Sequence, residues 1–179
     1  MEGPLTITKQ DCADTLYWWL SEHLAAHEVK AMAQQVGFQL KGRLGIRVNK
    51  KLYAKFFSEL FTLNMYLIAF ACEEAIAAEA PRNDVSALFH KLVYNRNIKV
   101  TGISYGRWIK LMKLIYDEYA RATEEKSLLT PVLLIAQAFE TNLFGKSVLD
   151  PYVRFETGMR IGGMLQQLSK LLHGYVIEC

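Results

Sequence analysis

The sequence predicts an all-α fold, a single-domain bundle of about six helices around a central buried helix at residues 51–76. The first half of this stretch has one polar stripe at helical spacing, formed by Lys51, Lys55, Ser58, Glu59 and Thr62. After Thr62 the apolar side chains point in every direction, and such a helix needs neighbours on all sides. The 51% hydrophobic and 22% charged content is typical of a globular core rather than a disordered chain.

The length and composition of the chain indicate one soluble domain. A chain of 179 residues is the size of a single domain, here 1–179, and can fold without a metal or disulfide. Cys12, Cys72 and Cys179 are widely spaced, which favours reduced thiols in the cytoplasm. The start of the chain lacks a signal-peptide pattern. The longest charge-free runs near the middle have 13 residues, whereas a membrane-spanning helix needs about 20, so no membrane span is expected.

Helix starts and stops divide the first half of the chain. A first helix is predicted from Thr8, in a capping-box pattern with Asp11, to about Val36, with Gly37 as the stop. Asn49 can cap the central helix. A break is predicted at 80–83, around Pro81, and a third helix from Asp84 to about Asn95.

Three further helices are predicted in the second half. Ser104 can cap the first of them, which carries Trp108. Thr130–Pro131 and Asp150–Pro151 each place a proline at the first helical position, where its missing N–H is harmless. The last helix carries the cleanest apolar stripe in the chain.

Two short segments alternate apolar and polar residues, which is the period of a strand. They cover residues 44–48 and 98–103 and lie between predicted helices. A minor two-stranded β element at these positions is therefore allowed within the all-α class.

Basic residues are segregated along the chain, although the net charge is only +3. Two windows, 29–58 and 85–116, contain seven and six basic residues and no acid. Such segregation produces a directional field. The candidate anion- or partner-binding residues are Arg43, Arg47, Lys50, Lys51, Lys99, Arg107, Lys110 and Trp108.

The leading hypothesis is a non-catalytic binding or regulatory module that recognises an acidic protein or another anionic partner. The cations would steer the partner, and exposed aromatic side chains such as Trp18 or Trp19, and Trp108, would be the anchors. The alternative is a nucleic-acid partner on the same surface, with Tyr94, Tyr105 and Trp108 as stacking faces. No phosphate-loop, triad or serine-hydrolase motif is present, so no cofactor is expected and a non-catalytic role is favoured over an enzyme, which stays an alternative.

Two further hypotheses place chemistry inside the bundle. His23 and His27 are four residues apart, which would put both imidazoles on one helix face, where a central-helix glutamate could complete a metal site. Asn64 lies in the apolar half of the central helix. It either fixes packing through hydrogen bonds to another helix or, with Tyr66, faces a small ligand in a pocket.

The last predicted helix contains Gly158, Gly162 and Gly163. These small residues permit close helix–helix approach, which is more often internal packing than dimerisation. A homodimer is therefore left open by the sequence.

Overall fold

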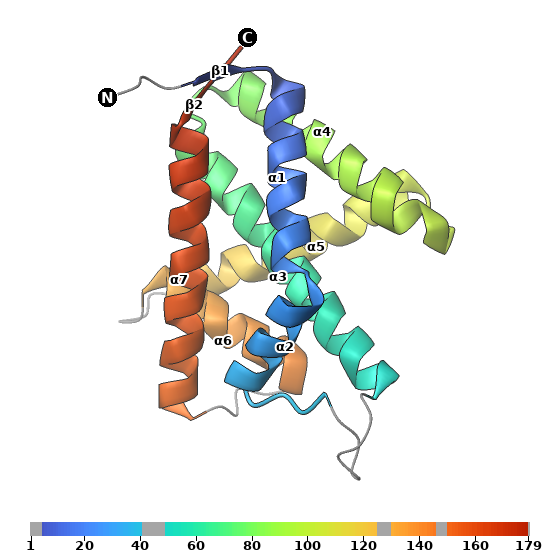
Figure 1. Cartoon of the computed structure of the whole chain (residues 1–179), viewed down its shortest axis with the longest axis vertical. Coiled ribbons are helices and arrows are strands. Elements are labelled where there is room, and N and C mark those ends of the chain that lie inside the picture. Colours follow the sequence, from blue (N-terminus) through green and yellow to red (C-terminus); the bar gives the residue numbers. More distant parts are fainter. Residues whose placement is uncertain (1–4, 41–48, 125–129, 146–149, 179) are drawn as a thin grey trace. The chain divides into compact units, whose positions relative to one another are not determined.

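The computed structural model describes residues 5–40, 49–124, 130–145 and 150–178. Within these ranges the protein is all-α, as predicted, with seven α-helices and one two-stranded sheet. The elements in chain order are β1 (Leu5–Ile7), α1 (Lys9–His23), α2 (Ala26–Gln35), α3 (Lys50–Ala75), α4 (Glu79–Val93), the π-helical turn η1 (Tyr94–Ile98), the 3₁₀ turn η2 (Lys99–Thr101), α5 (Tyr105–Glu124), α6 (Pro131–Phe144), α7 (Pro151–His173) and β2 (Tyr175–Ile177) (Figure 1).

The chain forms two compact units, each built from segments that are distant in the sequence. Unit 1 contains Met1–Ser21, Met65–Tyr116 and Met164–Cys179, and unit 2 contains Glu22–Asn64 and Asp117–Gly163. The helices α1, α3, α5 and α7 each contribute residues to both units. A single helical domain over residues 1–179 stays a prediction.

The helix α3 matches the predicted buried helix at 51–76. Six consecutive residues, Leu63–Ile68, are buried, so the helix is covered on every side over this stretch. In its first half Lys51, Lys55 and Ser58 are exposed, as the polar stripe predicts. Among the described helices α3 is also the one whose length and apolarity would suffice for a membrane span, but much of it is buried inside the protein, as in any core helix.

Local sequence signals explain where α1, α3, α6 and α7 begin. At α1 the Thr8 amide donates to the Asp11 carboxylate over 3.3 Å, and the Asp11 amide donates back to the Thr8 hydroxyl over 3.1 Å. This is the predicted capping box. The Asn49 side-chain oxygen accepts from the amides of Lys51 and Leu52 at the start of α3. The predicted starts at Pro131 and Pro151 are confirmed.

The predicted single helix from Thr8 to Val36 is wrong, because the chain breaks between α1 and α2. Ala25 has φ −59° and ψ 147°, an extended conformation. The reason lies in the apolar pattern. Val29 follows Leu20 by nine residues, which on one continuous helix would place it on the opposite face. Both side chains are buried, so the helix axis must be interrupted between them.

The break predicted at 80–83 lies a few residues too late. The helix α3 ends at Ala75, and α4 begins at Glu79, so that Pro81 lies in the first turn of α4. The first four N–H groups of a helix have no intrahelical acceptor, so a proline there removes no hydrogen bond.

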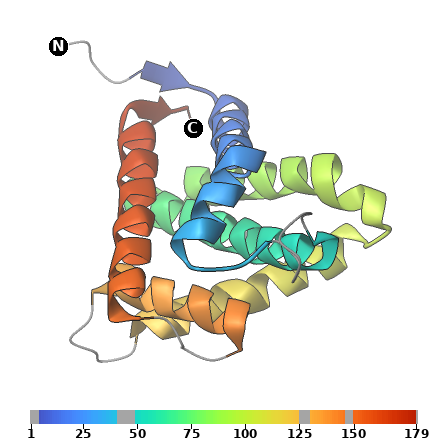
Figure 2. The ribbon, with the colours of Figure 1, turned by 60° about the horizontal axis from the view of Figure 1, so that its bottom comes forward.

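The sheet joins two segments of unit 1 that are far apart in sequence. Strand β1 pairs with β2 in parallel register, with Leu5 opposite Tyr175 and Ile7 opposite Ile177 (Figure 2). This is not the predicted β element. Residues 44–48 lie outside the described residues, and 98–103 form helical turns rather than a strand. Gly102, with φ +78°, ends these turns in a conformation that favours glycine.

Candidate binding surface

The second basic window of the sequence forms a helical hairpin within unit 1. The chain leaves α4 through the turns η1 and η2 and reverses direction into α5 (Figure 2). The reversal is closed by the hydroxyl of Tyr94, which donates to the carbonyl of Ile103 over 2.8 Å. The first backbone bond of α5 runs from the amide of Trp108 to the carbonyl of Ser104. The predicted start of this helix at Ser104 is therefore confirmed.

An aromatic cluster supports the reversal from the inside. The ring of Tyr94 lies 5.2 Å from that of Tyr105 and 5.9 Å from that of Trp108. The Trp108 ring lies 5.9 Å from the imidazole of His90, which in turn contacts Tyr116. Edge-to-face and tilted contacts of this kind add stabilisation beyond the buried area. The turn is thereby held in one conformation, which lowers the conformational entropy lost when a partner binds.

A second set of contacts fixes η1 against α1. The guanidinium of Arg96 lies 4.8 Å from the centroid of the Tyr17 ring. The Tyr17 hydroxyl donates to the side-chain oxygen of Asn97 over 3.0 Å. The position of Arg96 is therefore set by a cation–π contact rather than by a carboxylate.

The cations of this hairpin face solvent and are uncompensated. The six basic side chains of the window are all exposed, and no acidic residue occurs between Val85 and Tyr116. Among the described residues no ion pair joins any of them to a carboxylate. They are Lys91, Arg96, Lys99, Arg107, Lys110 and Lys113.

Apolar side chains lie among these cations. Val100 is 88% exposed, Leu114 64% and Leu111 43%, although each is large enough to gain from burial. Leu111 and Leu114 lie three residues apart on α5. Leu111 lies at the edge of the buried face that carries Trp108 and Met112, and Leu114 lies further toward solvent. We call the following set the tip surface: Arg96, Lys99, Val100, Arg107, Lys110, Leu111, Lys113 and Leu114.

The remaining cations of the predicted patch are not part of the tip surface. Arg43 and Arg47 lie outside the described residues. Lys50 and Lys51 are exposed at the start of α3 and belong to unit 2, whereas Lys99, Arg107 and Lys110 belong to unit 1. The joining of the two basic windows into one patch stays a prediction.

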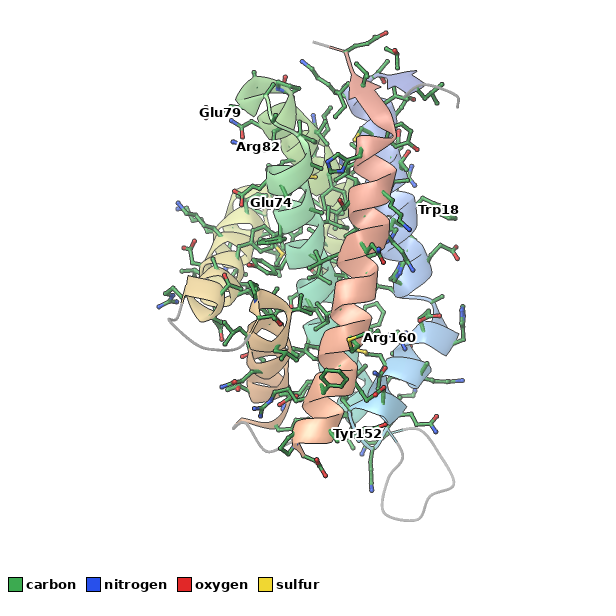
Figure 3. The ribbon with its side chains drawn as sticks, turned by 90° about the vertical axis from the view of Figure 1, so that its left-hand side faces the viewer. Trp18, Glu74, Glu79, Arg82, Tyr152 and Arg160 are labelled. Atoms are coloured by element: carbon green, nitrogen blue, oxygen red, sulfur yellow. The ribbon has the colours of Figure 1, made fainter. Side chains whose placement is uncertain are left out.

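The predicted role of Trp108 as an exposed anchor is wrong. Its side chain is only 4% exposed, because α5 turns it into the aromatic cluster. On α1 the two adjacent tryptophans separate as helical geometry requires. Trp19 is buried, whereas Trp18 is 61% exposed and points outward (Figure 3).

Asn64 is fully buried, as predicted, but its expected hydrogen bonds are not formed. Among the described residues neither its side-chain nitrogen nor its oxygen has a partner. Tyr66 is also buried, and its ring lies 6.1 Å from that of Phe70 and 6.2 Å from that of Tyr116. The ligand-facing role of Asn64 and Tyr66 stays a prediction.

The spacing argument for a metal site at His23 and His27 is wrong. The helix α1 ends at His23 and α2 begins at Ala26, so the two imidazoles do not share one helix. The described part of the chain also contains no group of three or more His, Cys, Asp or Glu side chains arranged to hold a metal ion.

The two described thiols have the properties of core residues. Cys12 and Cys72 are 1% and 2% exposed, and burial raises the pKa of Cys12 to about 11 and that of Cys72 to about 12. A thiol acts as a nucleophile in its thiolate form, which these pKa values suppress at neutral pH. The prediction that Cys72 is a small core residue is confirmed.

Two shallow grooves lie outside the tip surface. One, of about 520 Å³, belongs to unit 2 and is lined by Glu118 and Arg121 of α5 and by Gln137, Thr141 and Asn142 of α6, among others. The other belongs to unit 1 and lies beside Glu74, which is labelled in Figure 3. The second groove is also lined by Phe70, Leu165 and Ser169.

Comparison of the chain with protein-family models, with curated proteins and with solved structures gave no match. The functional argument therefore depends on the surface itself.

Proposed function

We propose that this protein is a non-catalytic binding module whose tip surface recognises an acidic protein. The observation that carries the proposal is the exposure of all six cations of an acid-free window, none of them paired with a carboxylate in the described chain. An uncompensated patch of one sign attracts partners of the opposite sign and increases their rate of association.

The apolar side chains of the tip surface support a protein partner over a nucleic acid. Val100, Leu111 and Leu114 would be buried by a partner that brings its own apolar groups. A single strand of nucleic acid would instead need open aromatic faces for stacking. Trp108 is buried, and Tyr105 is only 37% exposed.

The proposal is tested by titrating the purified protein with poly-L-glutamate and, separately, with single-stranded DNA. Lys99→Glu combined with Lys110→Glu reverses two cations of the tip surface. The matched control is Lys30→Glu combined with Lys170→Glu, which changes the net charge equally at two exposed positions outside it. We expect the tip variant to weaken poly-L-glutamate binding at least about tenfold and the control to weaken it far less.

Equal losses in the two variants would mean that only net charge matters, and the proposal would be wrong. DNA binding that is tighter than poly-L-glutamate binding and falls steeply with salt would replace the acidic protein by a nucleic acid as partner.

A further inference from the structure

The order of the side chains along the solvent face of α5 says more about the partner than the charge of that face does. Arg107, Lys110, Leu111 and Leu114 stand at positions i, i+3, i+4 and i+7, so they form one continuous ridge along the helix. Arg107 precedes Leu111 by one turn, and Lys110 precedes Leu114 by one turn. The ridge is thus a repeated pair of a cation followed by a leucine.

The ridge lies on a rigid element. The adjoining face of α5 is buried through Trp108 and Met112, and the start of the helix is supported by the rings of Tyr94 and Tyr105. From Arg107 to Leu114 the helix rises about 10 Å. This length matches two turns of a second helix lying alongside it.

From this geometry we infer that the partner segment recognised by the tip surface is an acidic amphipathic α-helix. The inference depends on the proposed function and specifies its partner. Apolar side chains of that helix cover Leu111 and Leu114, while its carboxylates, one turn apart, meet Arg107 and Lys110. In this mode of recognition the anchors are the apolar residues of the bound helix itself, at its positions i, i+3, i+4 and i+7.

Other occupants fit the ridge less well. An extended peptide that binds by strand addition needs an open sheet edge, and the described sheet, β1 with β2, belongs to other segments of unit 1. An anionic bilayer would also meet acidic groups, because the exposed Asp117 and Glu118 follow Leu114 by three and four residues on the same helix. A helical partner can instead place an uncharged or basic residue there.

The experiment uses a synthetic peptide of about 20 residues with leucine at heptad positions a and d, glutamate at e and g, and alanine and glutamine elsewhere. A second peptide has the same composition in shuffled order, so that it has equal charge but no apolar face. The protein variant is Leu111→Gln with Leu114→Gln, which keeps good helix formers at both positions. The matched control is Phe155→Gln with Met159→Gln, two apolar residues of α7 that are 51% and 62% exposed.

We expect the amphipathic peptide to bind at least about tenfold more tightly than the shuffled one, and the Leu111/Leu114 variant to lose that difference. The Phe155/Met159 control should keep it. Poly-L-glutamate binding should be unchanged in the leucine variant.

Equal binding of the two peptides, or no effect of the leucine substitutions, would overturn the inference. The proposed function would survive that result if the Lys99/Lys110 reversal still abolished poly-L-glutamate binding. Leucine-dependent binding to phosphatidylserine vesicles, without peptide binding, would also overturn it and point to a membrane surface.

Discussion

The hydroxyl of Tyr116 donates a hydrogen bond to Nε2 of His90 over 2.8 Å, while Nδ1 of the same ring donates to the carbonyl of Ser86 over 2.7 Å. A carbonyl can only accept, so Nδ1 carries a proton. Burial favours the neutral ring, and in that form Nε2 accepts from the Tyr116 hydroxyl. His90 is 8% exposed, and burial lowers its pKa below the ordinary 6.5, although the bond to Ser86 acts in the opposite direction. This pair connects α4 with α5 beneath the tip surface.

Stability should therefore decline when the pH falls below about 6.5. Between pH 6.5 and the lowered pKa of the folded state, His90 is protonated in the unfolded chain but not in the folded chain. The free energy of unfolding therefore decreases as the pH falls through this range. Urea unfolding at a series of pH values measures this, and the difference between wild type and His90→Asn isolates the contribution of His90. An identical pH profile in that variant would contradict the assignment.

The Tyr116→Phe variant removes the donor to Nε2 without changing the size of the ring. We expect the free energy of unfolding at pH 8 to fall by about 1–3 kcal/mol, because a buried acceptor is left unpaired. If the variant is as stable as wild type, this hydrogen bond contributes nothing measurable.

In unit 2, the buried Glu140 of α6 forms an ion pair with Arg154 of α7, whose side chain is 23% exposed. Oε2 of Glu140 accepts from Nε of Arg154 over 3.1 Å, and the Glu140 side chain is fully buried. Burial raises the pKa of Glu140, and Arg154 partly opposes the rise. Arg154→Met should destabilise the protein by about 3–5 kcal/mol at pH 8, because it leaves a buried carboxylate uncompensated.

The loss should be smaller at pH 5 than at pH 8. Removing the arginine raises the pKa of Glu140 further, so in the variant the carboxyl gains stability by protonation as the pH falls. The double variant Glu140→Gln with Arg154→Met removes the charge and should recover part of the stability at pH 8. A loss independent of pH would assign the effect to packing instead.

Two glycines of α7 give a matched pair of substitutions. A Cβ at Gly158 would lie 2.6 Å from Cδ2 of Leu133 on α6, whereas at Gly163 no atom lies within 4 Å. Gly163→Ala should stabilise the protein by about 0.5–1 kcal/mol, because alanine loses less backbone entropy in a helix. At Gly158→Ala the shift forced on Leu133 should cancel that gain. Thermal unfolding compares the two, and an equal gain in both would refute the close approach of α6 and α7 at Gly158.

Asn64 provides a test of an unpaired buried amide. Asn64→Leu replaces it by an apolar group of similar shape and should raise the free energy of unfolding by about 1–2 kcal/mol. Asn64→Asp, which buries a charge, should instead destabilise the protein. A loss of stability in the leucine variant would mean that the amide is hydrogen-bonded in solution.

The features that were predictable from the sequence depend on neighbouring residues. The capping box of Thr8 and Asp11, the cap at Asn49 and the prolines at 131 and 151 act within one turn, so their patterns are visible in a short window. The buried helix was equally predictable, since its apolar content leaves no solvent face between Leu63 and Ile68.

The features that the sequence did not predict depend on distant partners or on helix phase. The strand Leu5–Ile7 exists because Tyr175–Ile177 pairs with it, and three residues carry no usable period. Residues 98–103 alternate like a strand, but the bond from Tyr94 to Ile103 and the positive φ of Gly102 hold them in helical turns. The break at Ala25 has no glycine or proline, and only the phase difference between Leu20 and Val29 indicates it. The burial of Trp108, by contrast, could have been found from the sequence, because Met112 and Ile115 follow it by four and seven residues on one apolar helix face.

The central claim, that the tip surface is the binding surface, is tested most directly by a ¹H–¹⁵N NMR titration of the whole protein with the amphipathic acidic peptide. The account predicts that the backbone amides with the largest shifts fall between Arg96 and Leu114, and that these shifts disappear in the Lys99→Glu/Lys110→Glu variant. Shifts spread evenly over the exposed cations, or concentrated at Lys50 and Lys51, would contradict it.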